Sequence, residues 1–211
     1  MDLIQIAARY TACDKWNHHW YMDKYQHHFA HLQPCPINLL EIGIGGYEYP
    51  DRGGDSLKIW EEYFTNGMIY GLDIYDKTGL DTQRIKTIKG SQSDWDFLNS
   101  LKSELKFLNI VIDDGSHKSS DVIAAFENLF PWLPDGGIYV VEDTETSYWK
   151  DYGGDAKNLN KKTTTMGYFK ALCDGINHKS IAGFEHTPMY DLIKSITFYH
   201  NMIFITRGVN R

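Results

Sequence analysis

Two apolar runs in this sequence each end in a pair of acidic residues. Asn109-Ile-Val-Ile leads into Asp113 and Asp114, with His117 three residues beyond Asp114, and Gly137-Ile-Tyr-Val-Val leads into Glu142 and Asp143. If both runs are adjacent parallel strands, their carboxyl ends place up to four carboxylates and one imidazole together. Because no cysteine lies nearby, these oxygen donors favour a hard cation such as Mg²⁺, Mn²⁺ or Ca²⁺.

His117 is the candidate general base of this site, because imidazole titrates near neutral pH. A hydroxyl group is a poor nucleophile while it is protonated, and a base beside a metal ion can remove that proton. Taken alone, an acid at the end of a strand is more often a helix cap or a solvated group. The combination indicates a site, because clustered acids repel one another unless a cation is present.

A glycine-rich turn follows the first predicted strand, in Leu39-Leu-Glu41-Ile-Gly43-Ile-Gly45-Gly46. Glycines allow a backbone to approach a ligand closely. The dinucleotide fingerprint GxGxxG fails because Glu48 occupies its last position. The acidic Glu41, followed by Gly43 and Gly45, suits the amino group of the cationic S-adenosylmethionine better than a pyrophosphate. The alternative is a tight strand-to-helix turn without a ligand.

Three further polar residues are candidates for nucleotide contacts. Asp73 ends the second predicted strand, where an acid can bind both ribose hydroxyls. Gln92 and Asp94 follow the third strand and could contact the adenine edge. The alternatives are a solvated or capping role for Asp73 and a helix N-cap at Ser93 or Asp94.

Apolar runs alternate with amphipathic segments along most of the chain. The predicted strands are residues 37–43, 68–74, 84–89, 107–112 and 138–141. Three helices are predicted. The first covers residues 56–64 and is capped by Asp55 or Ser56, the second covers residues 93–105, and the third is capped by Ser119 or Ser120. We expect Leu57, Trp60 and Phe64 on one helix face, and Val122, Ile123, Phe126, Leu129 and Phe130 facing inward in the last helix.

This order predicts an α/β fold, a mostly parallel, Rossmann-like sheet with helices on both faces. The β-rich runs 194–199 and 202–206, separated by His200-Asn201, predict an antiparallel hairpin at the C-terminal end. A parallel sheet that ends in such a hairpin is the architecture of class I S-adenosylmethionine-dependent methyltransferases.

The 211 residues fit a single domain, 1–211, because domains typically contain about 50–250 residues. The net charge of −7 disfavours nucleic acid as a partner. Cys13, Cys35 and Cys173 are widely spaced, so we expect a reduced, cytoplasmic protein. The N-terminus lacks the pattern of a signal peptide, and no apolar stretch approaches the roughly 20 residues that span a membrane.

Six segments together resemble the catalytic domain of macrolide deoxysugar O-methyltransferases of the mycinamicin and tylosin type, and of rhamnosyl O-methyltransferases. They are residues 41–47, 53–57, 70–77, 90–94, 112–117 and 141–149, of which Ile-Asp-Asp-Gly-Ser-His and Val-Glu-Asp-Thr are the most specific. The resemblance implies S-adenosylmethionine and Mg²⁺ as cofactors, with His117 as the general base. It implies Asp114, Glu142 and Asp143 as metal ligands, and Glu41, Gly43, Asp73, Gln92 and Asp113 around S-adenosylmethionine.

The resemblance also bears on the acceptor side. Residues 14–21 resemble the segment that closes over the site in this family, so residues 1–36 are predicted to form a helical lid or interface segment. Tyr21, Tyr148 and Trp149 are the candidate acceptor contacts. A helix that packs on the sheet or at a subunit interface is the alternative for the N-terminal segment. The macrolide enzymes carry an additional N-terminal domain that we expect this chain to lack, so acceptor identity does not transfer.

These observations predict an O-methyltransferase of natural-product biosynthesis that methylates a hydroxyl of a sugar or glycosylated small molecule, in a homo-oligomer, either a dimer or a tetramer. Two other functions fit parts of the pattern. One is a metal-dependent enzyme acting on a non-sugar acceptor, similar to the cephalosporin-tailoring group. The other is a non-catalytic S-adenosylmethionine-binding subunit of a partner enzyme, against which the intact acid–histidine set argues.

Overall fold

The computed structural model describes residues 1–210. The chain divides into two compact units, Met1–Gly90 and Ser91–Arg211. Their strands form a seven-stranded mixed sheet. All paired strands are parallel except β7, which runs antiparallel to both of its neighbours. This arrangement confirms the predicted fold class. The single-domain organisation over 1–211 stays a prediction, and we describe each unit separately.

The first unit contributes three parallel strands in the order β3-β2-β1, which are β1 (Asn38–Ile42), β2 (Met68–Asp73) and β3 (Ile85–Lys89). Helix α4 (Asp55–Tyr63) packs on β2 and β3. Leu57, Trp60 and Phe64 are fully buried, as predicted. The predicted cap was wrong, because the N-cap is Gly54, whose φ of 70° places it in the left-handed region and which has no capping side chain.

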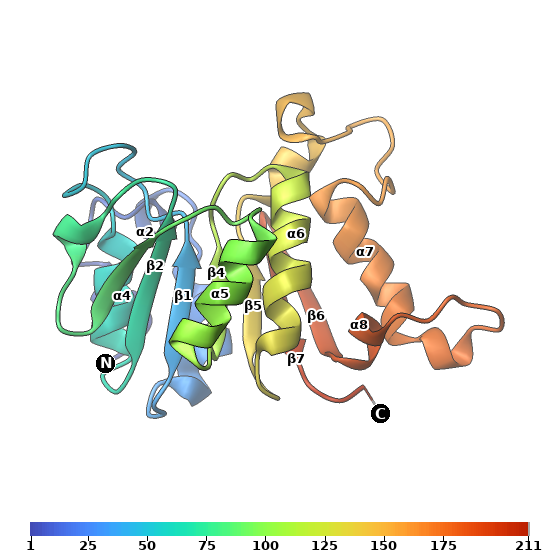
Figure 1. Ribbon diagram of the computed structural model, residues 1–211, viewed down its shortest axis with the longest axis horizontal. Coiled ribbons are helices and arrows are strands. Elements are labelled where there is room, and N and C mark those ends of the chain that lie inside the picture. Colours follow the sequence, from blue (N-terminus) through green and yellow to red (C-terminus); the bar gives the residue numbers. More distant parts are fainter. Residues whose placement is uncertain (211) are drawn as a thin grey trace. The chain divides into compact units, whose positions relative to one another are not determined.

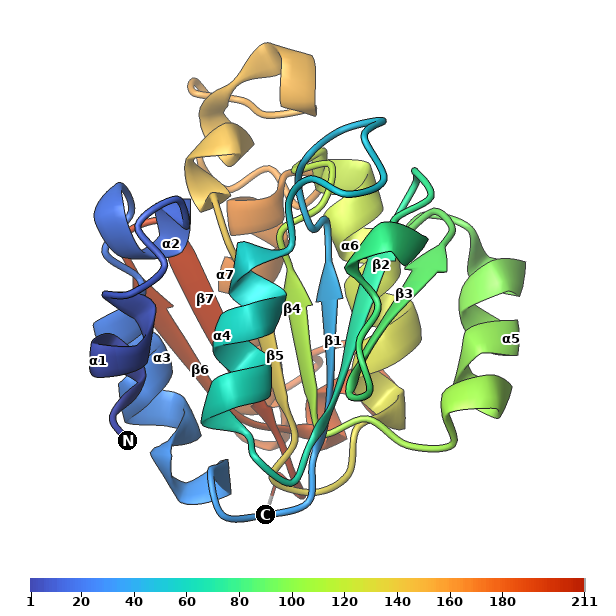
Figure 2. The same ribbon diagram turned by 90° about the vertical axis from the view of Figure 1, so that its left-hand side faces the viewer.

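The N-terminal residues of this unit are helical. Helices α1 (Leu3–Ala7), α2 (Asp14–Asn17) and α3 (Met22–Phe29) precede a 3₁₀ turn η1 (Ala30–Leu32), and α1 packs against α3 and α4 (Figure 2). Tyr25 and Phe29 place their rings 4.9 and 6.0 Å from that of Trp60. The segment is therefore fixed to α4 by an aromatic core, and a role as a lid stays a prediction.

The second unit contributes four strands in the order β4-β5-β7-β6. They are β4 (Ile110–Asp113), β5 (Ile138–Val141), β6 (Ile193–Tyr199) and β7 (Met202–Arg207). Tyr199 pairs with Met202, so the two residues His200-Asn201 form the predicted tight turn. Asn201 has a φ of 59°, a left-handed conformation that asparagine tolerates better than most residues. The C-terminal hairpin is confirmed.

Helices α5 (Trp95–Leu105), α6 (Ser119–Leu129) and α7 (Thr165–Ile176) belong to this unit, and α5 lies beside α6 (Figure 1). A short helix α8 (Pro188–Asp191) precedes β6. Five 3₁₀ turns complete the elements of the two units: η2 (Thr78–Leu80), η3 (Phe130–Trp132), η4 (Thr144–Tyr148), η5 (Lys150–Tyr152) and η6 (His178–Ser180).

Three details of the second unit differ from the predictions. Strand β4 begins at Ile110 because α5 ends in Lys106 with a φ of 64°, after which Phe107 is half-exposed. The N-cap of α6 is Lys118, and Ser119 instead accepts a hydrogen bond from the Thr165 amide. On the inner face of α6, Ala125 is buried where Ile123 was predicted.

None of the helices formed by residues 1–210 is both long enough and apolar enough to cross a membrane.

Candidate active site

The glycine-rich turn after β1 depends on glycine for steric reasons. Gly43, Gly45 and Gly46 all have φ between 70° and 79°. A Cβ at Gly46 would lie 2.1 Å from the carbonyl oxygen of Arg52, and one at Gly53 would lie 2.4 Å from that of Ile44. The turn is therefore folded tightly onto residues 52–53.

We expect Gly46→Ala to destabilise the protein by more than about 2 kcal/mol, because a left-handed alanine alone costs roughly 1–2 kcal/mol and the added methyl also meets backbone. Urea unfolding measures this. Gly136→Ala is the matched control, since Gly136 also has a positive φ of 85° but has no atom within 4 Å of its added Cβ. Equal losses in both variants would show that the turn is not tightly packed.

Asp73 connects this turn to the end of β2. Its Oδ2 accepts a hydrogen bond from the Ile44 amide at 3.2 Å, and its Oδ1 accepts one from the Tyr75 amide at 2.9 Å. The carboxylate is half-buried. A carboxylate has about four acceptor positions, so these two bonds leave capacity for the predicted ribose contact.

Glu41 is fully buried in β1 and has two observed partners. The Trp60 indole donates to its Oε2 at 2.9 Å, and the Lys15 ammonium lies 3.2 Å from its Oε1. Both charged side chains of this ion pair are almost completely buried, at 3% and 0% exposure. Glu41 therefore pairs with a lysine of α2, and its contact with the amino group of S-adenosylmethionine stays a prediction.

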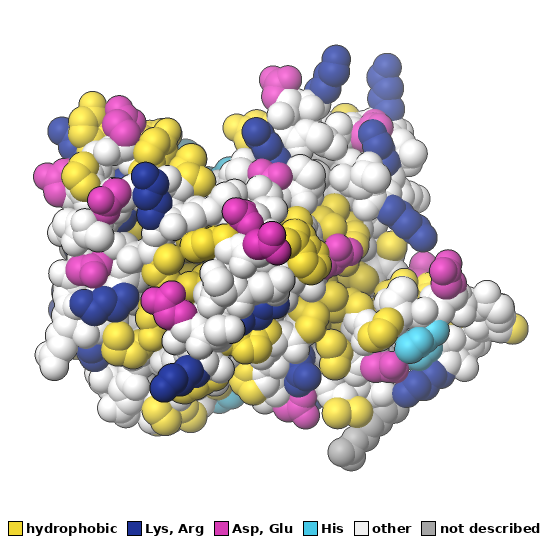
Figure 3. Space-filling model, in the orientation of Figure 1, with side chains coloured by type: hydrophobic (Ala, Val, Ile, Leu, Met, Phe, Trp, Pro, Cys, Tyr) yellow, Lys and Arg dark blue, Asp and Glu magenta, His cyan; other side chains and the backbone are white. Residues whose placement is uncertain are grey.

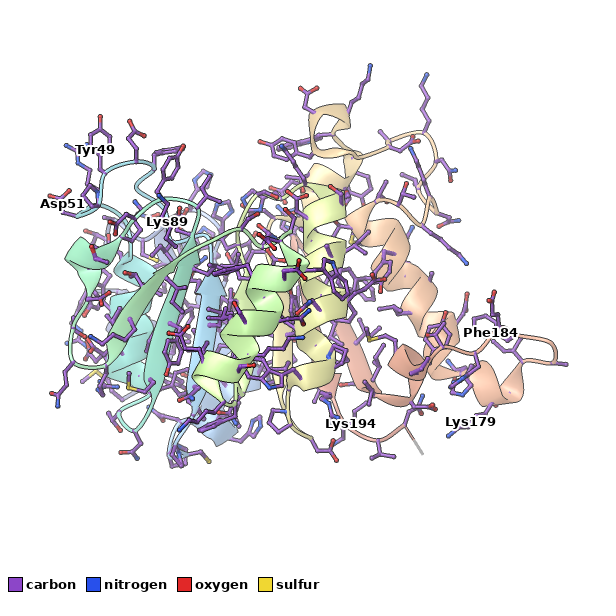
Figure 4. The ribbon with its side chains drawn as sticks, in the orientation of Figure 1. Tyr49, Asp51, Lys89, Lys179, Phe184 and Lys194 are labelled. Atoms are coloured by element: carbon purple, nitrogen blue, oxygen red, sulfur yellow. The ribbon has the colours of Figure 1, made fainter. Side chains whose placement is uncertain are left out.

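Lys77 fixes the loop between the turn and α4, a role that the sequence analysis did not identify. Its buried ammonium donates to the carbonyl oxygens of Tyr49 at 2.9 Å and Arg52 at 3.1 Å. The Arg52 guanidinium in turn lies 4.3 Å from the centre of the Tyr49 ring. Tyr49 and Asp51 mark the outer part of this loop (Figure 4).

In the second unit, strands β4 and β5 are adjacent and parallel, with Asp113 paired to Val141. The Glu142 amide donates to the Asp113 carbonyl at 3.0 Å. The two acidic pairs therefore leave neighbouring strands at the same level. This is the juxtaposition that the sequence predicted from the two apolar runs.

Asp114, His117 and Asp143 form a compact group at this end of the strands. The Nε2 atom of His117 lies 4.0 Å from Asp114 Oδ1 and 3.8 Å from Asp143 Oδ2. One possible ligand atom from each of the three residues lies within 4.8 Å of the others. The side chains are about one-fifth exposed, so a small ligand can reach them.

Two members of this group have unusual backbone conformations. His117 and Asp143 have φ of 56° and 51°, in the left-handed region. Such non-glycine residues cost roughly 1–3 kcal/mol each and cluster at functional sites. The Thr146 hydroxyl lies 3.2 Å from the carbonyl oxygen of His117 and 2.9 Å from that of Asp143. This buried threonine, which sequence reasoning missed, ties the two strained residues together.

The donor set fits the predicted hard cation. Mg²⁺ binds through one or two carboxylates and keeps several waters, and Asp114 and Asp143 offer two carboxylates beside a partly open face. Glu142, the third predicted ligand, is buried at 3% exposure and lies outside the 4.8 Å group found among the described residues. Its role as a ligand stays a prediction.

Asp113 ends β4, directly before Asp114, and is fully buried. Its Oδ1 accepts from the Gln92 amide nitrogen at 2.9 Å and its Oδ2 from the Tyr139 hydroxyl at 3.1 Å. Burial raises the pKa of Asp113 to about 7, against the lowering effect of these hydrogen bonds. Gln92 Oε1 also accepts from the Ser116 amide at 2.8 Å. Asp113 and Gln92 therefore support the loop that carries Asp114 and His117.

The raised pKa of Asp113 predicts a pH-dependent stability. The unfolded carboxyl titrates near its ordinary pKa of about 3.9, so the folded state binds the proton more tightly. The contribution is complete below about pH 4 and is lost as the pH rises through about 7. We expect the wild type to lose roughly 2–3 kcal/mol relative to Asp113→Asn between about pH 5 and pH 8, measured by urea unfolding.

Asn at position 113 is neutral and resembles the protonated acid, which is why its stability should not follow this titration. Asp96→Asn is the control, because Asp96 is exposed on α5. A difference between wild type and Asp113→Asn that stays constant with pH would contradict the raised pKa.

The remaining predicted residues have varied environments. Asp94 is the N-cap of α5, with its carboxylate accepting from the Phe97 amide at 3.0 Å, which is the alternative considered for it. Tyr21 is buried at 1% exposure and stacks on His19, whereas Tyr148 and Trp149 are 39% and 51% exposed at the end of η4. Contacts of these residues with a nucleotide or an acceptor stay predictions.

No protein-family model matches the chain, but several known proteins are similar to it in sequence. The 8-demethyl-8-(2-methoxy-alpha-L-rhamnosyl)-tetracenomycin-C 3'-O-methyltransferase of Streptomyces olivaceus is 46% identical over 213 residues, covering 99% of this chain and 54% of the relative. The mycinamicin VI 2''-O-methyltransferase of Micromonospora griseorubida is 39% identical over 212 residues, covering 99% of this chain and 53% of the relative. This chain is homologous to macrolide and tetracenomycin sugar O-methyltransferases.

A solved structure supports the same conclusion. The MycE methyltransferase of the mycinamicin biosynthetic pathway, solved in complex with Mg and SAH, matches with a TM-score of 0.94 and 38% sequence identity. The match covers 100% of this chain and 54% of that one. The chain thus spans about half the length of the sugar O-methyltransferases that it matches, and the resemblance inferred from six short motifs is confirmed over nearly the whole sequence.

Proposed function

We propose that this chain carries the activity of an S-adenosylmethionine-dependent O-methyltransferase that requires Mg²⁺ and methylates a sugar hydroxyl of a glycosylated natural product. The observation that carries the proposal is the group of Asp114, His117 and Asp143 at the adjacent ends of β4 and β5. The matched relatives are named as methyltransferases for rhamnosyl tetracenomycin and for mycinamicin VI, and MycE was solved with Mg and SAH.

In the proposed reaction, His117 Nε2 takes the proton of the acceptor hydroxyl. The oxygen then forms a bond to the methyl carbon while the bond from that carbon to sulfur breaks. The products are the methyl ether, S-adenosylhomocysteine and a protonated imidazole, which releases its proton to solvent. A bound Mg²⁺ would lower the pKa of the acceptor hydroxyl, and in-line positioning would supply much of the remaining acceleration.

The proposed cofactor residues fall into two sets, one in each unit. Asp114 and Asp143, with Glu142, would hold Mg²⁺. The glycine-rich turn with Gly43 and Gly45, and the Asp73 carboxylate that braces it, would hold S-adenosylmethionine. The other nucleotide contacts proposed from the sequence are Glu41, Gln92, Asp94 and Asp113, of which Asp113 and Gln92 also position the Asp114–His117 loop.

Acceptor contacts would come from aromatic side chains. Trp149 is half-exposed and its ring lies 5.9 Å from that of Tyr152. Tyr148 precedes it on η4, and Tyr21 is the N-terminal candidate. Aromatic faces are suited to the apolar faces of sugars and aglycones because they bury a large area with few rotatable bonds.

The test compares glycosylated small molecules with their own aglycones, in the presence of S-adenosylmethionine and Mg²⁺. We expect S-adenosylhomocysteine to form with glycosides and not with the matching aglycones. Equal release with both members of a pair would place the methyl group on the aglycone and contradict a sugar acceptor.

We also propose that the protein is a cytoplasmic homo-oligomer, a dimer or a tetramer. Exposed aromatic side chains, including Trp20 at 62% and Trp95 at 46%, support this proposal, because aromatic residues are enriched at protein interfaces. Light scattering coupled to size-exclusion chromatography measures the mass directly, and a monomer at micromolar concentration would contradict the oligomer.

A further inference from the structure

A second group of possible metal ligands lies in the second unit, on a segment that the proposed reaction does not use. His178 begins η6, His186 lies in the loop that follows, and Asp191 ends α8. One ligand atom from each of the three lies within 4.8 Å of the others. Figure 3 shows histidine and acidic side chains near one another at the surface in this region.

One hydrogen bond of His178 determines which of its ring nitrogens can bind a metal ion. Its Nδ1 lies 2.9 Å from the Gly175 carbonyl oxygen, and a carbonyl can only accept, so Nδ1 carries the hydrogen. In the neutral ring, Nε2 then presents a lone pair. This arrangement is typical of metal-binding histidines, whose second nitrogen donates to a carbonyl or carboxylate that fixes the tautomer.

The lone pair of His178 faces another acceptor. Nε2 lies 3.6 Å from Asp191 Oδ1, where the carboxylate attracts either a proton or a metal ion held on this nitrogen. The second oxygen of the same carboxylate, Oδ2, accepts a hydrogen bond from His186 Nε2 at 2.7 Å, so a metal ion that binds this nitrogen would replace the hydrogen it carries. Asp191 therefore bridges two imidazoles.

The spacing and the donor types agree with a borderline cation such as Zn²⁺. When ligands lie about 2.0 Å from zinc in a tetrahedron, neighbouring ligand atoms lie roughly 3.3 Å apart. The three candidate ligand atoms already lie within 4.8 Å of one another, so small side-chain movements would bring them to that spacing. Two imidazoles and one carboxylate leave a fourth position for water. This set is softer than the pair of carboxylates beside His117, so the two groups should differ in metal preference.

The His178 ring is held by packing contacts, whereas the other two side chains are accessible to solvent. The ring of His178 lies 4.9 Å from that of His186 and 5.9 Å from that of Tyr190, and the His178 side chain is only 8% exposed. The side chains of His186 and Asp191 are 48% and 44% exposed, so an ion can enter from solvent. The neighbouring Lys179 ammonium is bonded to the Asn210 carbonyl.

We propose that His178, His186 and Asp191 bind a Zn²⁺-class divalent cation that ties the loop between α7 and α8 to the start of β6. The ligands enclose residues 179–190, a segment whose loop carries the labelled Phe184 and projects beyond the end of α7 (Figure 4). Strand β6 begins two residues after Asp191. Joining the three ligands would restrain this segment beside the C-terminal hairpin, independently of methyl transfer.

The test titrates Zn²⁺ into a protein in which the first group has been disabled by Asp114→Asn and Asp143→Asn, using a chromogenic chelator as competitor. We expect about one equivalent to bind. Adding His186→Ala or Asp191→Asn should weaken that binding by more than about 100-fold, since loss of an outer-shell partner alone typically costs 10–100-fold. His31→Ala, at an exposed histidine of the first unit, is the matched control.

A second measurement locates the ion. Zn²⁺ should slow proteolysis within residues 181–187 in the protein with an intact second group, and should leave the rate unchanged in the His186→Ala variant. Equal Zn²⁺ affinity with and without His186 and Asp191, or the same cleavage rate with and without Zn²⁺, would overturn the proposal. Because both readouts are independent of methyl transfer, failure here and failure of the proposed function are distinguishable.

Discussion

Replacing His117 with alanine is expected to lower kcat by about 10²–10⁴-fold, the range that general-base catalysis typically contributes. The reason is that the other two members of the group, Asp114 and Asp143, are carboxylates. Carboxylates that hold a cation are poor bases, which leaves Nε2 of His117 to accept the proton. The measurement is the rate of S-adenosylhomocysteine formation at saturating S-adenosylmethionine, Mg²⁺ and acceptor.

The control measurements separate a base from a metal ligand. In His117→Ala, calorimetry should find S-adenosylmethionine and Mg²⁺ binding within about threefold of the wild type, a change below roughly 0.7 kcal/mol. His31→Ala, at an exposed position, should retain full activity. A kcat near that of the wild type would remove His117 from the mechanism, and a large loss of Mg²⁺ affinity would make it a ligand.

Removing the divalent cation is expected to lower the rate by at least about 1000-fold, because Lewis-acid stabilisation is worth several kcal/mol and each 1.36 kcal/mol corresponds to a factor of ten. Activity should disappear in EDTA and return when Mg²⁺ is added in excess. Asp143→Asn should reproduce the loss at low Mg²⁺, since it removes the charge of one carboxylate while keeping nearly the same shape.

The matched control for that variant is Asp151→Asn, an exposed acid of the nearby η5 turn. It should require no more Mg²⁺ than the wild type. Full activity after thorough chelation, or an unchanged Mg²⁺ requirement in Asp143→Asn, would exclude the metal from catalysis.

The group of Asp114, His117 and Asp143 was predictable because it lies at the ends of regular strands. Buried parallel strands read as continuous apolar runs, and the residues after each run must emerge at the same edge of the sheet. Asp114, His117 and Asp143 follow from that rule. The C-terminal hairpin was predictable for a similar reason, since two residues between β-rich runs leave few other connections.

The supporting residues were not predictable in this way. Lys15 and Lys77 are buried lysines, a rare environment for the type, and each is explained by a partner distant in sequence: Glu41 for one and the carbonyls of Tyr49 and Arg52 for the other. The group of His178, His186 and Asp191 was not predicted from the sequence either. Its members are thirteen residues apart at most, but the spacing matches no regular helix or strand repeat.

The N-caps of α4 and α6 could not be predicted from the sequence. Polar residues stood at both predicted helix starts, yet Gly54 and Lys118 are the observed N-caps. At α4 the left-handed Gly54 is set by the packing of the preceding turn, and at α6 the Ser119 hydroxyl is used by Thr165 instead. Tertiary contacts thus overrode the local preference. Asp94, which has no such competing partner among the described contacts, does cap α5.

The most direct test of the central claim uses S-adenosylmethionine with a deuterated methyl group and tandem mass spectrometry of the product. With Mg²⁺ present, we predict that a glycosylated acceptor gains one labelled methyl group and that the label stays with the sugar fragment when the glycosidic bond is broken. The same mixture in EDTA should give no labelled product. A label on the aglycone fragment, or labelled product formed equally well in EDTA, would contradict the account.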